Sequence, residues 1–212
     1  MNILLFGATG LTGKEVMIQA LEKNYNVIAV VREPKNIIIN HTNLNIVKGD
    51  ILNIEIFEKF VKDVDVIIST VGTGTSLKKA YKPTTLYSDG FANIIELMNK
   101  YNKKRFIALL SVGTVPDPNE ALIHKTVIHP MLKGTYEDMR RAESLLAKNK
   151  NILWTGIRPL RLNNKPKTGT YRIAKIILPK NGVNISRADV ADLILKQINS
   201  DKFIHEYVTI AD

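Results

Sequence analysis

Short apolar runs alternate with amphipathic segments along most of the chain. Six runs are rich in isoleucine and valine and are mostly apolar on both faces, as strands of a buried parallel sheet are. They are Ile3–Phe6, Val27–Val31, Leu44–Val47, Val64–Val71, Phe106–Leu110 and Ile152–Ile157. Helical periodicity lies between or after them, in Val16–Lys23, Ile54–Val61, Ile94–Tyr101 and Tyr136–Lys148. This alternation predicts an α/β fold with a doubly wound parallel sheet in three α/β/α layers.

The last part of the chain carries the clearest helix. In ISRADVADLILKQI, Ser186 can cap the first turn and Asp189 occupies the third helical position. Apolar residues recur on one face of this helix, and they are Val190, Leu193, Ile194 and Ile198. YVTI, residues 207–210, predicts a final strand.

The one long irregular stretch is 112–134, and residues 160–185 are a second candidate loop. Loops of that length in a compact domain are usually functional or contain a short helix of their own. We therefore expect a single domain over residues 1–212, in which both stretches serve as lid or substrate loops.

The segment GATGLTG, residues 7–13, lies between the first strand and the first helix. Its spacing suits a turn that binds the pyrophosphate of a dinucleotide. Gly7 permits the tight turn, Gly10 lets the backbone approach the phosphates, and Gly13 lets the helix pack on the sheet. The phosphates would then meet free amides at the positive end of a helix dipole. A strand before and a helix after the motif predict dinucleotide binding by Gly7, Thr9, Gly10, Leu11, Thr12 and Gly13.

The end of the second strand, AVVREPKN, bears on which dinucleotide is bound. NAD sites usually place a carboxylate there, which accepts hydrogen bonds from the ribose 2′-hydroxyl. Here Arg32 occupies that place, with Lys35 close behind, and a guanidinium suits a 2′-phosphate. The sequence thus predicts NADP(H). The neighbouring Glu33 keeps NAD(H) open, and a solvated Arg32 is the structural alternative.

Further candidates follow the next two strands. Asp50 and Ile51 come after the third strand, where an aspartate can accept the adenine amino group. VGTGT follows the fourth strand and would line the ribose and pyrophosphate through Val71, Gly72 and Thr73. Because parallel strands end at one edge of the sheet, these residues are expected to share a ligand site.

Composition narrows the range of functions. The chain has 212 residues, of which 45% are hydrophobic, and it has no cysteine, which excludes disulfides and thiolate chemistry. No apolar run approaches the roughly 20 residues of a membrane helix, and MNILLFGATG is not a leader peptide, so a cytoplasmic location is expected. The net charge of +10 comes from scattered lysines, which favours attraction of anionic small molecules over nucleic-acid binding.

Several motifs together resemble the atypical short-chain dehydrogenase/reductases. They are GATGLTG, VRE, GD, the S-V-G after the fifth strand, the R-P of GIRPL and ISRADVA, with echoes in PTTLYSDGFANII and TGTYRI. The chain is most similar to the small NAD(P)H-binding group that contains NmrA-like proteins and biliverdin-IXβ reductase, also called flavin reductase. The resemblance runs from Asn2 to Ile198 and implies a Rossmann-like fold with NADPH across the strand ends.

The resemblance also implies roles for residues after the fifth and sixth strands. By position, Ser111 and Val112 would flank the nicotinamide, and Pro159 and Leu160 would contact the amide side of the cofactor. Where the biliverdin reductases carry histidines near the substrate, this chain has Asp138 and Leu160, which argues against tetrapyrrole specificity.

Ordinary short-chain dehydrogenases use a tyrosine, a lysine four residues later and a serine from the preceding strand. Here Tyr136 and Arg140 occupy roughly these places beside Ser111. The i, i+4 spacing puts both side chains on one helix face, but arginine cannot act as an amine. The alternative is that Tyr136 packs against the lid and that Arg140 is a surface cation. His124 and His129 in the lid are candidate substrate contacts.

Flavin reduction would not need the tyrosine, because hydride passes to flavin N5 and solvent can supply the proton. The sequence therefore predicts an NADPH-dependent oxidoreductase, monomeric or homodimeric, that reduces a flat acceptor such as a flavin, a quinone or a biliverdin-like molecule. The alternative is an NmrA-like redox sensor that binds NADP(H) without turnover. A nucleotide-sugar epimerase or dehydratase is less favoured, because few residues follow Pro159 for a substrate domain.

Overall fold

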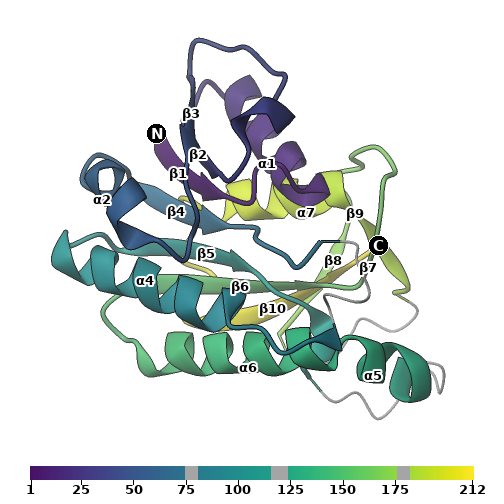
Figure 1. The fold of residues 1–212 in the computed structure, drawn as a ribbon. Helices are drawn as coiled ribbons and strands as arrows, with labels where there is room; N and C mark the ends of the chain where they lie inside the picture. The colour runs from purple at the N-terminus through teal and green to yellow at the C-terminus, as the bar shows by residue number, and fades with distance from the viewer. Residues whose placement is uncertain (75–80, 116–123, 176–181) are drawn as a thin grey trace.

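A computed structural model describes residues 1–74, 81–115, 124–175 and 182–212. Its centre is a sheet with helices on both faces (Figure 1). Over the described residues, the sheet contains the strands β1 (Asn2–Phe6), β2 (Asn26–Val31), β3 (Leu44–Lys48), β4 (Val66–Ser69), β5 (Arg105–Leu109), β6 (Leu153–Pro159), β8 (Arg172–Ala174) and β10 (Glu206–Ala211). A separate pair is formed by β7 (Arg161–Asn163) and β9 (Asn184–Ser186).

The strand order is β3-β2-β1-β4-β5-β6-β10-β8, and every pair is parallel except β10 with β8. Leu4 of β1 lies between Ile28 of β2 and Ile67 of β4. The order reverses at β1, since β2 lies on one side of it and β4 on the other. That arrangement confirms the predicted doubly wound fold, and it creates a crevice where α/β proteins bind ligands.

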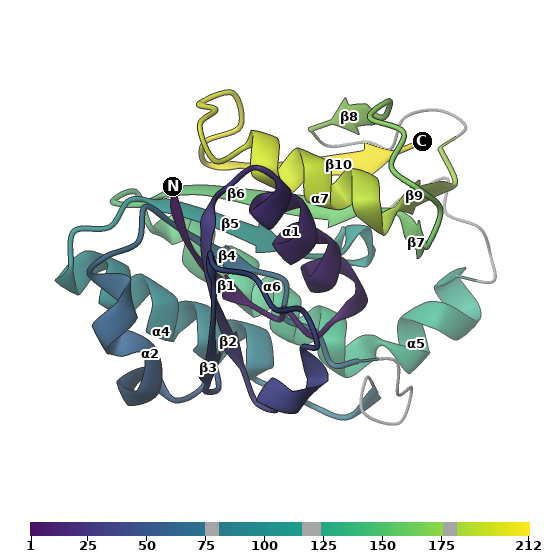
Figure 2. The ribbon, with the colours of Figure 1, turned by 90° about the horizontal axis from the view of Figure 1, so that it is seen from above.

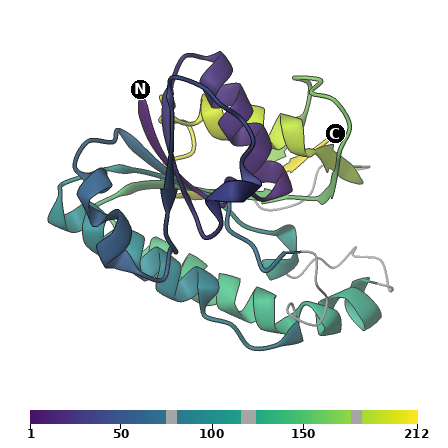
Figure 3. The ribbon, with the colours of Figure 1, turned by 45° about the horizontal axis from the view of Figure 1, so that its top comes forward.

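Two layers of helices cover the sheet. Helices α1 (Leu11–Glu22) and α7 (Arg187–Lys196) pack on one face, and α2 (Ile54–Val61), α4 (Leu86–Lys100) and α6 (Lys133–Lys148) pack on the other (Figures 2 and 3). Leu5 of β1 belongs to the first core and Leu4 to the second. Both faces of the strands are buried in this way, which explains why the strand sequences are apolar without alternation.

The structure corrects the start of α4. The apolar pattern predicts a helix from Ile94, but α4 begins at Leu86. Its first turns contain Ser88 and Gly90, which have weak helical propensity and hide the helix in the sequence. Ser88 is buried against Asp138 of α6 and Gly90 against Ile51, so tertiary packing outweighs local propensity.

The two predicted loop regions have different structures. The described part of 112–134 contains the short helices η2 (Val112–Thr114), η3 (His124–Ile128) and α5 (His129–Met131), and its role as a lid stays a prediction. The stretch 160–185 is not simply a loop, because it contains β7, β8 and the start of β9. Three-residue strands are too short to show a period in the sequence. Residues 116–123 and 176–181 lie outside the described part of the chain.

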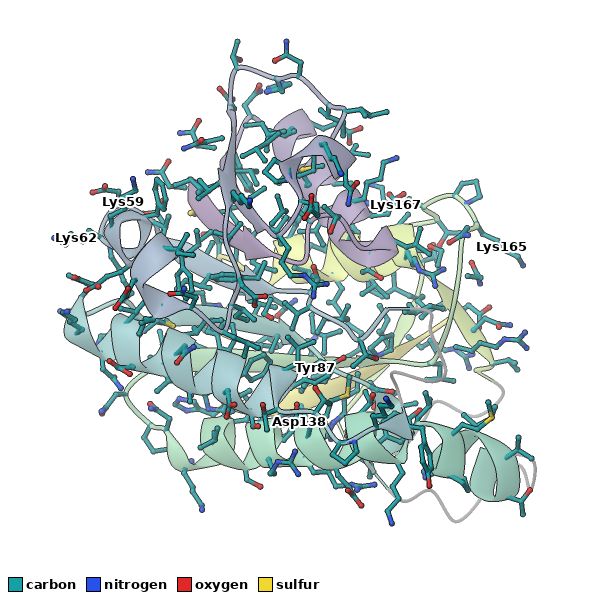
Figure 4. All side chains as sticks on the ribbon, in the orientation of Figure 1. Lys59, Lys62, Tyr87, Asp138, Lys165 and Lys167 are labelled. Carbon is teal, nitrogen blue, oxygen red and sulfur yellow. The ribbon has the colours of Figure 1, made fainter. Side chains whose placement is uncertain are left out.

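A buried carboxylate joins α4 to α6. Asp138 on α6 is fully buried and accepts hydrogen bonds from the backbone N–H of Tyr87 at 2.7 Å and of Ser88 at 3.3 Å. The Ser88 hydroxyl at 2.5 Å and the Arg141 guanidinium at 3.1 Å also donate to it. Asp138 therefore caps α4 from a neighbouring helix (Figure 4). It lies between two helices, and its carboxylate is occupied by the donors of α4 and by Arg141.

Replacing this cap should destabilise the fold. In Asp138→Asn, one amide N–H would face the N–H donors of α4, and we expect the free energy of unfolding to fall by roughly 2–4 kcal/mol. Urea denaturation measures this change. The control is Asp89→Asn, which removes an exposed carboxylate from the same first turn and should cost much less. Equal losses in the two variants would show that the buried network does not hold α4.

Candidate functional site

A cleft of about 800 Å³ runs along the carboxyl ends of the parallel strands. It is lined by the turn between β1 and α1, by the ends of β2, β4, β5 and β6, by the segment before α2, and by the first turns of α4 and α6. Such a cleft lies where strand order reverses, the usual ligand position in a doubly wound sheet. Its volume is in the range of small-molecule and cofactor sites.

Close contacts fix the glycine turn, residues 7–13. Gly7 has φ +83°, and a Cβ at this position would lie 2.6 Å from the carbonyl of Thr70. A Cβ on Gly13 would lie 2.1 Å from the Gly7 oxygen. Both glycines are therefore required by the protein's own packing. Gly13 does not line the cleft. This position supports the packing role that the motif predicts for Gly13, which here packs against Gly7 and the end of β4.

Gly10 differs from its two neighbours in the motif. Its backbone, at φ −75° and ψ 158°, is one that any residue adopts, and a Cβ would meet only the Gly7 oxygen at 3.2 Å. Gly10 caps α1, whose first turn has no side-chain cap and no acidic residue. The first amides of a helix lack intrahelical partners, so this end of α1 presents N–H groups and a positive dipole end to the cleft. A pyrophosphate fits this arrangement.

The far end of the cleft carries Arg32, directly after β2. Its side chain is exposed and lines the cleft, and no described residue forms an ion pair or hydrogen bond with it. The adjacent Glu33 instead lies 3.8 Å from the Lys35 ammonium, with both side chains exposed. Lys35 does not line the cleft. The structure therefore brings Arg32, but not Lys35, to the predicted position.

Asp50 and Ile51 line the same end. One carboxylate oxygen of Asp50 accepts the N–H of Leu52 at 3.0 Å, which fixes the side chain in a local turn. The other oxygen has no hydrogen-bond partner among the described residues. It is available to a donor such as an adenine amino group. Val71, Gly72 and Thr73, predicted after β4, also line the cleft.

The opposite end holds four of the residues predicted near the nicotinamide: Ser111, Tyr136, Pro159 and Leu160. Val112 does not line the cleft. The Ser111 hydroxyl accepts the N–H of Gly113 at 3.2 Å. A Cβ on Gly113 would lie 2.3 Å from Cζ of Tyr136, so the tyrosine ring packs on a glycine and only 8% of the residue is exposed.

Arg140 does not join this group. Its side chain is exposed, does not line the cleft, and donates a hydrogen bond from Nε to the Thr114 carbonyl at 3.1 Å. Arg140, four residues after Tyr136, therefore contacts η2, and its guanidinium does not line the cleft. The ring of His129 contacts Tyr136 edge-on at 5.3 Å between centroids. The side chain of His124 lies outside the described residues.

Sequence reasoning missed several residues of the cleft. Tyr87 lines it with 2% exposure, and its hydroxyl bonds to the backbone of Thr73. Burial raises the pKa of Tyr87 well above its ordinary value, which makes it a neutral part of the lining. Thr70, Leu162 and Arg187 also line the cleft without having been predicted. The echo PTTLYSDG contained Tyr87, but no spacing rule pointed its ring toward a ligand.

The fold and the cleft together define a Rossmann-type dinucleotide-binding protein. A family model described as NAD(P)H-binding matches residues 7–201. The chain therefore belongs to this NAD(P)H-binding family.

Solved structures from bacteria resemble the chain over nearly its whole length. The oxidoreductase ylbE from Lactococcus lactis is 25% identical, with a TM-score of 0.79 and coverage of 100% of this chain and 91% of its own. A Bacteroides thetaiotaomicron protein, provisionally described as an epimerase, is 26% identical, with a TM-score of 0.80 and coverage of 99% and 96%. A short-chain dehydrogenase/reductase from Veillonella parvula, in complex with NADP, is 18% identical, with a TM-score of 0.81 and coverage of 100% and 94%.

The lengths of the described helices bear on whether the chain can cross a membrane. Within the ranges that the structure describes, no helix is both long and apolar enough to span a bilayer.

Gly10 gives the most direct test of the phosphate site. In Gly10→Val, two methyl groups would occupy the space that the phosphates need, and we expect NADPH to bind roughly 100-fold more weakly or worse. Isothermal titration calorimetry measures the affinity, and Gly10→Ala should give an intermediate loss. Thermal unfolding should show that both variants remain folded. Unchanged NADPH affinity in Gly10→Val would place the pyrophosphate elsewhere.

Proposed function

We propose that this protein is an NADPH-dependent reductase that passes hydride to a flat conjugated acceptor, such as a flavin, a quinone or a biliverdin-like molecule. One observation carries the proposal, namely the hydrogen bond from Arg140 to the Thr114 carbonyl. A carbonyl reductase needs a cation beside its tyrosine, to lower the pKa of the phenol. Arg140, the sequence equivalent of that cation, does not line the cleft and donates instead to η2.

The lining near Tyr136 supports an acceptor that binds by stacking. Besides Tyr136, the lining includes leucine and methionine side chains, and they are Leu110, Leu132, Met139, Leu160 and Leu162. When bound, a reduced nicotinamide supplies the hydride. The contribution of the chain is to hold two flat rings against each other. The cleft is open to solvent, which can protonate the reduced acceptor.

The preference for NADPH over NADH belongs to the same proposal. Arg32 is unpaired among the described residues and borders the cleft, whereas Glu33 is held near Lys35. A carboxylate that faced the ribose would repel a 2′-phosphate. An unpaired guanidinium would instead donate two parallel hydrogen bonds to it.

Arg32→Ala should separate the two cofactors. We expect NADPH to bind about tenfold more weakly and NADH to be nearly unaffected, because an exposed charge-assisted hydrogen bond is worth about 1.5 kcal/mol after screening. Calorimetric titration with each cofactor measures the difference. Lys35→Ala is the control, since Lys35 lies outside the cleft and should change neither affinity much. Equal weakening of NADPH and NADH would mean that Arg32 stacks on the adenine.

A second candidate is a redox sensor of the NmrA-like kind, which binds NADP(H) without turnover. The same Arg140 contact favours it, because an arginine that is engaged with η2 also fits a cleft that binds the cofactor without catalysis. The two candidates differ in a single observable, the steady oxidation of NADPH in the presence of an acceptor.

Tyr136→Phe tests the proposed chemistry. With FMN as acceptor, we expect steady NADPH oxidation by the parent protein and a loss of less than about threefold in the variant, because solvent supplies the proton. Absorbance at the NADPH band follows the reaction. A loss on the order of 100-fold would indicate acid catalysis, as in a carbonyl reductase or an epimerase. Tight NADPH binding without oxidation by any flavin or quinone would favour the sensor.

A further inference from the structure

A second arginine lines the cleft from the opposite side to Arg32. Arg187 is the first residue of α7, is partly buried, and borders the same cleft as the glycine turn. Its Nη1 donates to the Asn164 side-chain oxygen at 2.6 Å. Within the described residues, no carboxylate forms an ion pair with it.

Strand pairing holds this arginine in place. In the β7–β9 pair, Leu162 is opposite Ile185 and Asn163 is opposite Ser186, so Asn164 and Arg187 follow side by side. Gln19 of α1 donates to the Ala188 carbonyl at 2.9 Å, which ties the start of α7 to α1. The first turn of α7 therefore has a fixed position relative to the helix that carries the phosphate site.

A reciprocal cap also stabilises that turn. The Ser186 hydroxyl accepts the N–H of Asp189 at 2.9 Å and donates to the Asp189 carboxylate at 2.7 Å. Asp189 further accepts the N–H groups of Thr168 and Gly169. Burial opposes ionisation of Asp189, but hydrogen bonds from Gly169, Ser186 and Thr168 outweigh it and lower the pKa. These donors occupy the Asp189 carboxylate, which therefore does not neutralise Arg187.

Arg187 is thus a charged group with unused donors. Burial lowers the pKa of its guanidinium, but arginine stays protonated at any physiological pH. A guanidinium has five N–H donors, and one of its two terminal nitrogens is bound to Asn164. A partly desolvated cation without a carboxylate, next to a cleft that admits a dinucleotide, matches phosphate oxygens in charge and in geometry.

We propose that Arg187, oriented by Asn164, is a second phosphate-binding group of the cleft, contributed by the C-terminal part of the chain. The phosphate can come from the cofactor's pyrophosphate or from a phosphate carried by the acceptor. The second source rests on the proposed function, whereas the first needs only cofactor binding.

The first experiment measures NADP⁺ affinity by calorimetry, without turnover. The variants are Arg187→Gln, Arg187→Lys and the control Arg161→Gln. Arg161 lies on β7, is exposed and does not line the cleft, so its replacement removes the same charge from the same region. If the cofactor is the source, Arg187→Gln should weaken binding about tenfold or more. Arg187→Lys should recover part of the loss, and the Arg161 variant should stay within about twofold.

The second experiment titrates FMN and riboflavin into the NADP⁺-loaded protein and follows quenching of flavin fluorescence. If the acceptor is the source, NADP⁺ affinity is unchanged and the preference for FMN over riboflavin falls about tenfold in Arg187→Gln. The proposal is overturned if the variant matches Arg161→Gln in both titrations, or if neither flavin binds and NADP⁺ affinity is unchanged. Failure of the proposed reductase function would appear separately, as absent NADPH oxidation with intact binding.

Discussion

The approach of the glycine turn to the end of β4 is the contact on which the rest of the structure depends. A Cβ on Gly13 would overlap the Gly7 oxygen at 2.1 Å, and a Cβ on Gly7 would overlap the Thr70 carbonyl at 2.6 Å. The Thr70 hydroxyl adds a hydrogen bond to the Phe6 carbonyl at 2.9 Å. Because these groups touch, α1 starts directly at the end of β1, and its unpaired amides open where strand order reverses. A side chain at position 7 or 13 would therefore push α1 away from the sheet.

The other side of the cleft is held by α6. Asp138 fixes the start of α4, and the Tyr87 hydroxyl then bonds to the backbone of Thr73 in the loop after β4. Arg140 and Glu143 fix η2 through the carbonyl and the hydroxyl of Thr114, at 3.1 Å and 2.8 Å. One helix thus positions both the loop and the turn that flank Tyr136. Arg140, which resembles a catalytic group in sequence, here supports η2 beside the cleft.

The sequence predicted the parallel sheet and the glycine turn because their signals are local, namely apolar runs and a motif between a strand and a helix. It failed where the cause lies far along the chain. The first turns of α4 depend on Asp138, 51 residues after Tyr87. The strands β7 and β9 are too short to show a period, and only their pairing brings Arg187 to the cleft. Arg140 had the expected spacing, but the direction of its side chain was decided by a carbonyl of η2, which spacing cannot reveal.

The helix ends help to direct anions to the glycine turn. The positive end of α4 is closed by the buried carboxylate of Asp138, and that of α7 is closed by Ser186 and Asp189. At the cleft, α1 has no side-chain cap and no acidic residue in its first turn. A net charge of +10 raises the local concentration of any anion around the molecule, but it selects no position. Where an anion binds depends on which backbone amides have no carboxylate of the chain as a partner. Single residues determine this, namely Gly10 at the start of α1 and Asp138, which caps α4.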